Sequence, residues 1–310
     1  MILMNDFKAE PLELREAMLK AANRVLESGW YVLGNECKQF EEQWSTVCGV
    51  GHGIGVANGM DAIEIALLGL SIGGGDEVIT TPMTAFATIL AIIRSGAKPV
   101  LADIDSETAL LSIESVRRSL TANTKAVILV HLYGQVRQMD EWVNFCEENK
   151  IMLIEDCAQA HQATWQGKVA GCFGQAGAYS FYPTKNLGAV GDAGMLVTNN
   201  STLAEKARQL RNYGQSERYL HPVVGMNSRL DEIQAVMLSE RMKWLPEFTK
   251  YRRQIADTYH AKIDNPLVKH LIKPEQKSAH VYHLFVITCP QRDALQAHLL
   301  KKGVQALIHY

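Results

Sequence analysis

The 310-residue sequence lacks the cysteine and histidine patterns that hold disulfides or metals. Its six cysteines contain no C-x-x-C pair and fall singly in apolar or helical contexts, as reduced core cysteines do. Its ten histidines form no H-E-x-x-H motif and no carboxylate cluster at metal-ligand spacing. The sequence therefore predicts neither a disulfide framework nor a metal site.

Long hydrophobic runs and a strong charge of one sign are also missing. No apolar stretch reaches the roughly 18 residues that a membrane span requires. The N-terminus carries acidic residues from position 6 onward, unlike a signal peptide. The formal net charge is −2, without the basic excess of a nucleic-acid-binding protein. We expect a cytoplasmic protein whose partners include no membrane and no nucleic acid.

Three common catalytic motifs are absent. The glycines of GVGHGIG at 49–55 do not match the dinucleotide-binding pattern G-x-G-x-x-G. Neither a G-x-x-x-x-G-K-[ST] phosphate loop nor a G-x-S-x-G nucleophile elbow occurs. This argues against a nicotinamide-dependent sugar enzyme in particular.

What the sequence does contain is an alternation of β-rich and amphipathic stretches. The predicted strands are 76–81, 98–104, 125–132, 151–155, 176–181 and 194–199, and the helices among them are 84–94, 113–120 and 139–149. Such spacing predicts an α/β fold with a mostly parallel sheet covered on both faces. Ligands of these sheets bind at the carboxyl ends of the strands.

The pattern changes after about residue 228. Helices are predicted at 231–243 and, after a break at Pro246, at 247–263; a strand at 282–288 and a helix at 291–302 follow. We therefore expect a large domain over 1–235 and a smaller α+β domain over 236–310. The N-terminal segment of about 30 residues is expected to pack on the small domain.

Two charged residues follow predicted strands of the sheet. Asp156 comes directly after 151–155, where it would either cap a helix opening at DCAQA or present a fixed negative charge to a ligand. Lys185 lies in SFYPTKNLGAVGDAG at 180–194. Its amine would either extend to solvent from a packed stem or, partly desolvated, attack a carbonyl group.

Two polar turns precede predicted helices. The segment 57–61 (ANGMD) is either ordinary turn and cap chemistry or an anion site, because free N–H groups at a helix N-terminus favour phosphate. The segment 225–231 (GMNSRLD) reads as a cap. Together, a strand-end carboxylate, a lysine one strand later and a helix N-terminus are what pyridoxal phosphate (PLP) chemistry needs.

At this point the sequence resembles a known family. The segments VANGMDAIEIAL, GGGDEVITTPMTAFAT, PVLADID, VHLYGQ, IEDCAQAHQA, YSFYPTKNLGAVGDAGMLVTNN, LRNYGQ and GMNSRLDEIQAVML resemble the DegT/DnrJ/EryC1/StrS nucleotide-sugar aminotransferases, in order and over essentially the whole chain. The resemblance implies a fold-type-I, PLP-dependent enzyme. Its seven-stranded, mostly parallel sheet would lie between helices, beside the smaller C-terminal domain.

The resemblance assigns roles in cofactor binding. Lys185 looks like the lysine that binds the cofactor aldehyde and moves the proton between the cofactor carbon and the substrate carbon. Asp156 would pair with the pyridine nitrogen, Gln159, one helical turn on, would contact the ring hydroxyl, and Phe86 would stack on the ring. The remaining contacts, all to phosphate, would come from Gly59, Met60 and Ser180, and, across a homodimer interface, from Asn227 of the neighbouring subunit.

Three features depart from the family pattern. Met60 stands where many members have threonine, so a phosphate-binding hydroxyl is lost while the backbone N–H remains. Gln162 replaces the glycine of the usual AQAHGA. The family's small domain also normally continues beyond position 310, which makes the small domain look truncated here.

The resemblance also implies a reaction. L-Glutamate would donate the amine, and the acceptor would be a keto sugar on a nucleoside diphosphate. Tyr182, where relatives acting on 4-keto sugars more often have histidine, favours a dTDP-linked 3-keto-6-deoxyhexose. The residues expected to face the substrate are Tyr31, His161, Tyr182 and Tyr213.

Other functions stay open at this level. A 4-keto sugar aminotransferase of the same family is the first alternative. A dehydratase- or epimerase-like relative would have histidine in place of Lys185. A regulatory homologue without activity would be expected to have lost Lys185 or Asp156, and both are present.

Overall fold

The computed structural model describes residues 1–310. Its centre is a seven-stranded sheet in the order β1-β9-β8-β5-β4-β2-β3. In that order the strands are β1 (His52–Val56), β9 (Gly194–Thr198), β8 (Ala176–Ser180), β5 (Met152–Asp156), β4 (Thr124–Val130), β2 (Glu77–Thr80) and β3 (Lys98–Leu101). The five strands from β8 to β3 are parallel, and β9 runs antiparallel to both of its neighbours. The prediction of a mostly parallel seven-stranded sheet is confirmed.

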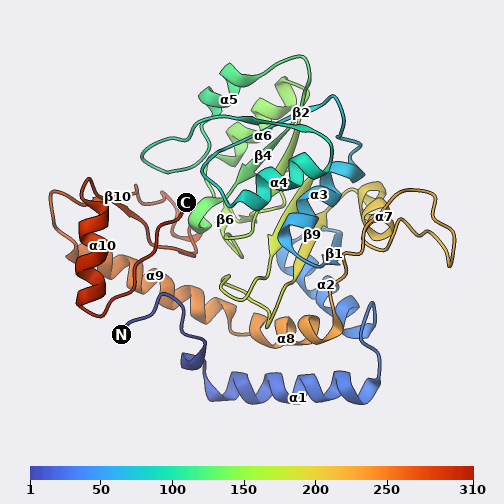
Figure 1. Cartoon of the computed structure of the whole chain (residues 1–310), viewed down its shortest axis with the longest axis horizontal. Helices are drawn as coiled ribbons and strands as arrows, with labels where there is room; N and C mark the ends of the chain where they lie inside the picture. The colour runs from blue at the N-terminus through green and yellow to red at the C-terminus, as the bar shows by residue number, and fades with distance from the viewer.

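Both faces of the sheet are covered by helices because its strands are apolar on both sides. Along β4, Val127 and Leu129 belong to one core, while Ala126 and Ile128 belong to the other, as the two-residue period of a strand requires. The first core includes residues of α2 (Asn35–Cys48), α5 (Ile113–Ser119) and α6 (Met139–Glu148). The second includes residues of α3 (Gly59–Gly69), α4 (Phe86–Arg94) and α7 (Ser201–Leu210) (Figure 1).

The C-terminal part of the chain lies beside this sheet. Helix α1 (Leu12–Ser28) runs along α8 (Glu232–Met242), and α9 (Leu245–Lys262) continues from α8 toward α10 (Arg292–Lys301) (Figure 1). The short elements are β6 (Thr164–Trp165) with β7 (Lys168–Val169), β10 (Lys269–His270) with β11 (Ile287–Thr288), and the 3-10 helices Phe7–Ala9, Leu132–Gly134 and Lys277–Ala279.

The N-terminal segment contacts the C-terminal region. Ile2 forms a β-bridge with Val304, and the Met4 N–H donates to Oε1 of Gln305 at 3.0 Å. The packing of the first 30 residues on a separate small domain stays a prediction. The domain boundary at 235/236 stays a prediction.

One predicted element is shorter than expected, and one alternative is not realised. Of the expected strand 282–288 only Ile287–Thr288 is a strand, because the preceding backbone is bonded elsewhere: the Val281 N–H donates to the Gly134 carbonyl, and Arg252 donates to the carbonyls of Tyr282 and His283. The helix that DCAQA could have opened after Asp156, one of the two alternatives for that residue, is also absent, and residues 157–163 form turns and irregular backbone.

Gln162, which replaces the glycine of the family pattern, adopts a backbone conformation that favours glycine. Its φ of 63° lies in the left-handed region, which glycine adopts freely and other residues adopt at a cost of about 1–2 kcal/mol. The usual family glycine at this position is therefore explained by backbone conformation, and Gln162 keeps that conformation.

The expectations about cysteines and membrane spans are tested directly. All six cysteines are unpaired, and every one except Cys289 is buried. None of the helices combines the length and the apolar character needed to cross a bilayer.

Two adjacent isoleucines on α4 test the packing of the second core. Ile92 is fully buried, whereas Ile93 is 50 % exposed. We expect Ile92→Ala to lower the free energy of unfolding by about 2–5 kcal/mol through the cavity it leaves. Ile93→Ala should change it by about 0.5 kcal/mol or less. Urea denaturation followed by circular dichroism measures both, and equal losses would contradict this placement of α4.

Candidate active site

Lys185 lies in the loop between β8 and β9, past the carboxyl end of a central strand. Its backbone N–H donates to the Tyr182 carbonyl at 2.8 Å, which fixes the turn. The amine forms no ion pair with any carboxylate of the chain. Burial lowers the pKa of Lys185, and the nearby charge of Asp156 opposes this shift. A larger share of the amine is therefore neutral than in an exposed lysine.

Asp156 is the last residue of β5, and its side chain is held at both oxygens. Oδ2 accepts a hydrogen bond from Oγ1 of Thr88 at 2.8 Å, and Oδ1 accepts one from the Ala158 N–H at 3.1 Å. Thr88 is in turn 2.8 Å from the hydroxyl of Thr84. The two threonines belong to the TPMTAFAT motif, yet sequence reasoning missed their role because it depends on how α4 docks over β5.

Gln159 lies between two tyrosines. Its Oε1 accepts a hydrogen bond from the Tyr133 N–H at 2.6 Å, and its Nε2 donates to the hydroxyl of Tyr310 at 2.8 Å. The Tyr133 hydroxyl donates to the His309 carbonyl at 2.6 Å. The segment 309–310 thus folds onto the site. Nothing in the periodicity of the sequence indicates this contact.

The start of α3 meets Ser180 at the end of β8. Asn58 caps the helix by accepting a hydrogen bond from the Asp61 N–H at 2.8 Å. Gly59, the first helical residue, approaches so closely that a Cβ atom there would lie 2.7 Å from Cβ of Ser180. The first N–H groups of α3, including that of Met60, therefore lie beside the serine, as an anion site requires.

These residues fit pyridoxal 5′-phosphate. The lysine amine has no acidic partner and a lowered pKa, the strand-end carboxylate is buried and fixed, and the glycine at the helix N-terminus allows a close approach to Ser180 that any side chain would block. The amine of Lys185 matches the aldehyde of that cofactor, and the carboxylate of Asp156 matches its protonated ring nitrogen. The helix N-terminus at Gly59 matches its phosphate.

The aromatic residues predicted at the site differ in their exposure. Phe86 begins α4 and is 65 % exposed, so its ring is free to cover a ligand. Tyr182 is also exposed and lies three residues before Lys185. His161 does not fit the expectation that it faces the substrate. It is fully buried among Trp44, Tyr179 and Phe181, and Nε2 is 3.0 Å from the Ser180 carbonyl oxygen.

Asn227, Tyr213 and Tyr31 form no hydrogen bond with the residues around Lys185. Asn227 is exposed and pairs with Asn212. The Tyr213 ring lies 5.2 Å from the guanidinium of Arg229. The Tyr31 carbonyl accepts a hydrogen bond from the Glu232 N–H at the start of α8. Their roles toward substrate or a second subunit stay predictions.

A buried carboxylate that the sequence analysis did not single out stands next to Asp156. Glu155 is fully buried and lies 2.9 Å from Nε2 of His131. It accepts hydrogen bonds from the backbone N–H groups of Gly171, Phe173 and Gly174. This network holds the end of β5 in place. Its only signal in the sequence is that the segments IED (154–156) and VH (130–131) place charged or polar residues at the ends of two neighbouring strands.

A cavity of about 820 Å³ elsewhere in the molecule does not contain these groups. Two charged groups of its lining have partners within the chain: Arg211 pairs with Glu41, and Glu232 accepts three backbone N–H groups at the start of α2. A smaller cavity of about 180 Å³ borders Lys185. Of the predicted cofactor contacts, only Lys185 lines this smaller cavity.

Comparison with known proteins agrees with this geometry. The model of the DegT/DnrJ/EryC1/StrS aminotransferase family matches residues 12–310. The dTDP-3-amino-3,6-dideoxy-alpha-D-galactopyranose transaminase of Aneurinibacillus thermoaerophilus is 43 % identical over 100 % of this chain and 85 % of its own length. A pleiotropic regulatory protein of Geobacillus stearothermophilus is 41 % identical over 99 % and 83 %. The structure of S. venezuelae DesV in complex with a ketimine intermediate has a TM-score of 0.96 and 39 % identity, covering 100 % of this chain and 83 % of that one.

Gly59→Ala tests the cradle at the start of α3. The added methyl must displace Ser180 or the helix. Overpacking of this kind costs about 1–3 kcal/mol, which would correspond to roughly 5- to 150-fold in cofactor affinity if it falls on the bound state. We expect PLP to bind that much more weakly, as measured by absorbance titration. Gly74→Ala is the matched control, since nothing lies within 4 Å of its Cβ. Unchanged affinity in Gly59→Ala would remove the cradle from the site.

Asp156→Asn tests the electrostatic link to Lys185. Because the negative charge of Asp156 raises the pKa of Lys185 against the effect of burial, removing the charge should lower that pKa further. In the cofactor-free protein, labelling of Lys185 by an amine-directed reagent should then begin at lower pH than in the wild type. Mass spectrometry measures it, with exposed Lys302 as reference. A shift to higher pH would contradict the proximity of the two groups.

Proposed function

The chain belongs to the DegT/DnrJ/EryC1/StrS aminotransferase family, and from that premise we propose that it transfers an amino group to C3 of a nucleotide-linked 6-deoxy-keto-hexose. Aminotransfer and PLP dependence are properties of the family. The observation that carries the proposal for this chain is the half-buried amine of Lys185, which has no ion-pair partner and lies within the field of Asp156. A lysine kept partly neutral in this way serves as a general base.

Each residue of the site has a distinct task. Bound PLP supplies an electron sink. Asp156, fixed by Thr88 and Ala158, would keep the ring nitrogen protonated, because an adjacent anion favours the charged form. Gln159 would donate to the ring hydroxyl, and Phe86 would cover the ring face.

Phosphate binding and proton transfer complete the assignment. The backbone N–H groups of Gly59 and Met60, with the Ser180 hydroxyl, would hold the phosphate. Lys185, once released from the cofactor, would take the proton from the substrate carbon as a neutral amine and return it to the cofactor carbon. Its lowered pKa favours the first of these steps.

The substrate assignment rests on similarity and on one residue. The transaminase of Aneurinibacillus thermoaerophilus is named for a dTDP-3-amino sugar, and Tyr182 stands where relatives acting on 4-keto sugars more often have histidine. Both support a dTDP-linked sugar with the keto group at C3, and a 4-keto substrate is the alternative. L-Glutamate is the proposed amino donor.

A regulatory role is the second alternative, since a similar protein carries a regulatory name. Lys185 and Asp156 are both in place with their contacts intact, which favours catalysis. The exposed apolar residues of the loop before Asn227 support a homodimer in which Asn227 reaches the partner's phosphate site. These residues are Tyr219, Leu220, Val223 and Val224. A cytoplasmic location stays a prediction.

Lys185→Ala tests the function. Without the amine, the visible band of the lysine-bound cofactor and all turnover should be lost, whereas circular dichroism should stay unchanged. Lys185→Arg is the matched control, because it keeps the positive charge but cannot bind the aldehyde. We expect wild type to aminate 3-keto faster than 4-keto nucleotide sugars in a product assay by mass spectrometry. Unchanged transamination in Lys185→Ala would overturn the role of the lysine. A preference of the wild type for 4-keto sugars would overturn the assignment of the reaction to C3.

A further inference from the structure

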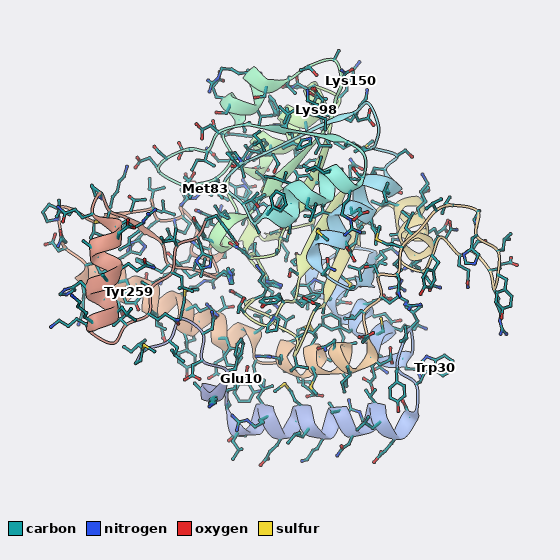
Figure 2. All side chains as sticks on the ribbon, viewed as in Figure 1. Glu10, Trp30, Met83, Lys98, Lys150 and Tyr259 are labelled. Atoms are coloured by element: carbon teal, nitrogen blue, oxygen red, sulfur yellow. The ribbon has the colours of Figure 1, made fainter.

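The cavity of about 180 Å³ beside Lys185 contains a second cation without an acidic partner. The cavity is bordered by the loop 183–186, by Arg241 and Phe248, by Arg252 of α9, and by residues 4–7 and 10 of the N-terminal segment. Figure 2 shows Glu10 at the start of α1, beneath the junction of α8 and α9. Three segments far apart in the sequence thus enclose one small space next to the reactive amine.

Among the charges around this cavity, Arg241 forms an ion pair with Glu10. Asp6, on the exposed N-terminal rim, accepts a hydrogen bond from the Lys8 N–H at 3.0 Å and has no cationic partner. Lys185 would be occupied by the cofactor. Arg252 remains, because no carboxylate of the chain lies within ion-pair distance of it.

The hydrogen bonds of Arg252 leave most of its donors free. A guanidinium group has five N–H donors. Arg252 uses only Nη1, which donates to the carbonyls of Tyr282 and His283 at 3.2 Å each. Burial lowers the pKa of Arg252, and no acidic group opposes the shift. A desolvated cation without a counter-charge is costly and is stabilised when an anion binds.

Arg252 and Lys185 are connected by a short chain of contacts. Arg252 donates to the carbonyl of His283, and Nδ1 of His283 lies 3.1 Å from Oδ1 of Asn186, the neighbour of Lys185. Both cations act on the same ring, since Lys185 and Arg252 each lower the pKa of His283. The cavity therefore has a positive potential on the side away from its N-terminal rim.

We propose that Arg252 binds a carboxylate of the amino-acid amino donor while the donor's amine reacts at the Lys185 position. The planar fork of guanidinium matches a carboxylate with two parallel hydrogen bonds. The cavity is smaller than the roughly 300–1,000 Å³ of sites for larger ligands, so it suits an amino acid better than a nucleotide sugar. This inference rests on the proposed aminotransferase function.

The test compares Arg252→Gln with Arg253→Gln. Arg253 is the neighbour on α9; it also donates only to carbonyls of the small domain, those of His280 and Ser278, and does not border the cavity. Loss of charge-assisted hydrogen bonds should raise the glutamate concentration for half-maximal bleaching of the PLP enzyme roughly 10- to 100-fold in Arg252→Gln. Arg252→Lys should lie between, and Arg253→Gln should match wild type.

Two further measurements separate the explanations. Glutarate, a dicarboxylate that cannot react, should bind wild type and Arg253→Gln equally and Arg252→Gln more weakly in calorimetry. The reaction of the pyridoxamine form with keto sugar should be unchanged in Arg252→Gln. If Arg252→Gln instead slowed only the reaction with the keto sugar, Arg252 would be assigned to the diphosphate of the nucleotide sugar, and the proposal would be overturned.

The remaining outcomes are equally decisive. Unchanged glutamate and glutarate binding in Arg252→Gln would overturn the carboxylate site, and so would equal weakening in Arg253→Gln, which would reveal a packing role. A wild-type protein that does not bind PLP would overturn the proposed function instead. In that case the glutarate titration still decides whether Arg252 binds carboxylates.

Discussion

The buried carboxylate of Glu155 holds together the segments on which the site depends. Its partners come from two other parts of the chain, the end of β4 through His131 and the loop before β8 through three backbone N–H groups. A buried carboxylate without such partners would be strongly destabilising. Because successive strand residues point to opposite faces of the sheet, anchoring Glu155 on one face directs Asp156 to the other, toward Thr88.

The pairing register of the strands then aligns the end of β5 with its two neighbours. Asp156 is aligned with Val130 on β4 and with Ala178 on β8. The chain leaves β8 two residues later, at Ser180, and enters the loop that contains Lys185. The carboxylate, the serine and the lysine therefore meet because three parallel strands end at the same edge of the sheet.

The balance of charge separates functional from structural groups in this molecule. The ion pairs between Arg211 and Glu41 and between Arg241 and Glu10 are compensated within the chain. Lys185 and Arg252 are desolvated without such partners, and burial lowers the pKa of each. A desolvated cation destabilises the fold unless a bound ligand stabilises it. The two cations without ion-pair partners beside one small cavity therefore indicate where anionic or carbonyl ligands bind.

The sequence by itself determined the sheet, its helical layers and the placement of Asp156 and Lys185 at one edge of the sheet, because these follow from local periodicity and from the rule that parallel strands present their ends together. Local pattern was insufficient where tertiary contacts outweigh it. The segment after Asp156 forms turns and not the helix that DCAQA could have opened, and the backbone of 281–283 is bonded by a loop and by Arg252. His161 is buried among aromatic rings. Only the tertiary structure placed Thr88, Tyr310 and Arg252 at the site. Their roles depend on contacts between residues far apart in the chain, which no period or motif of a single sequence records.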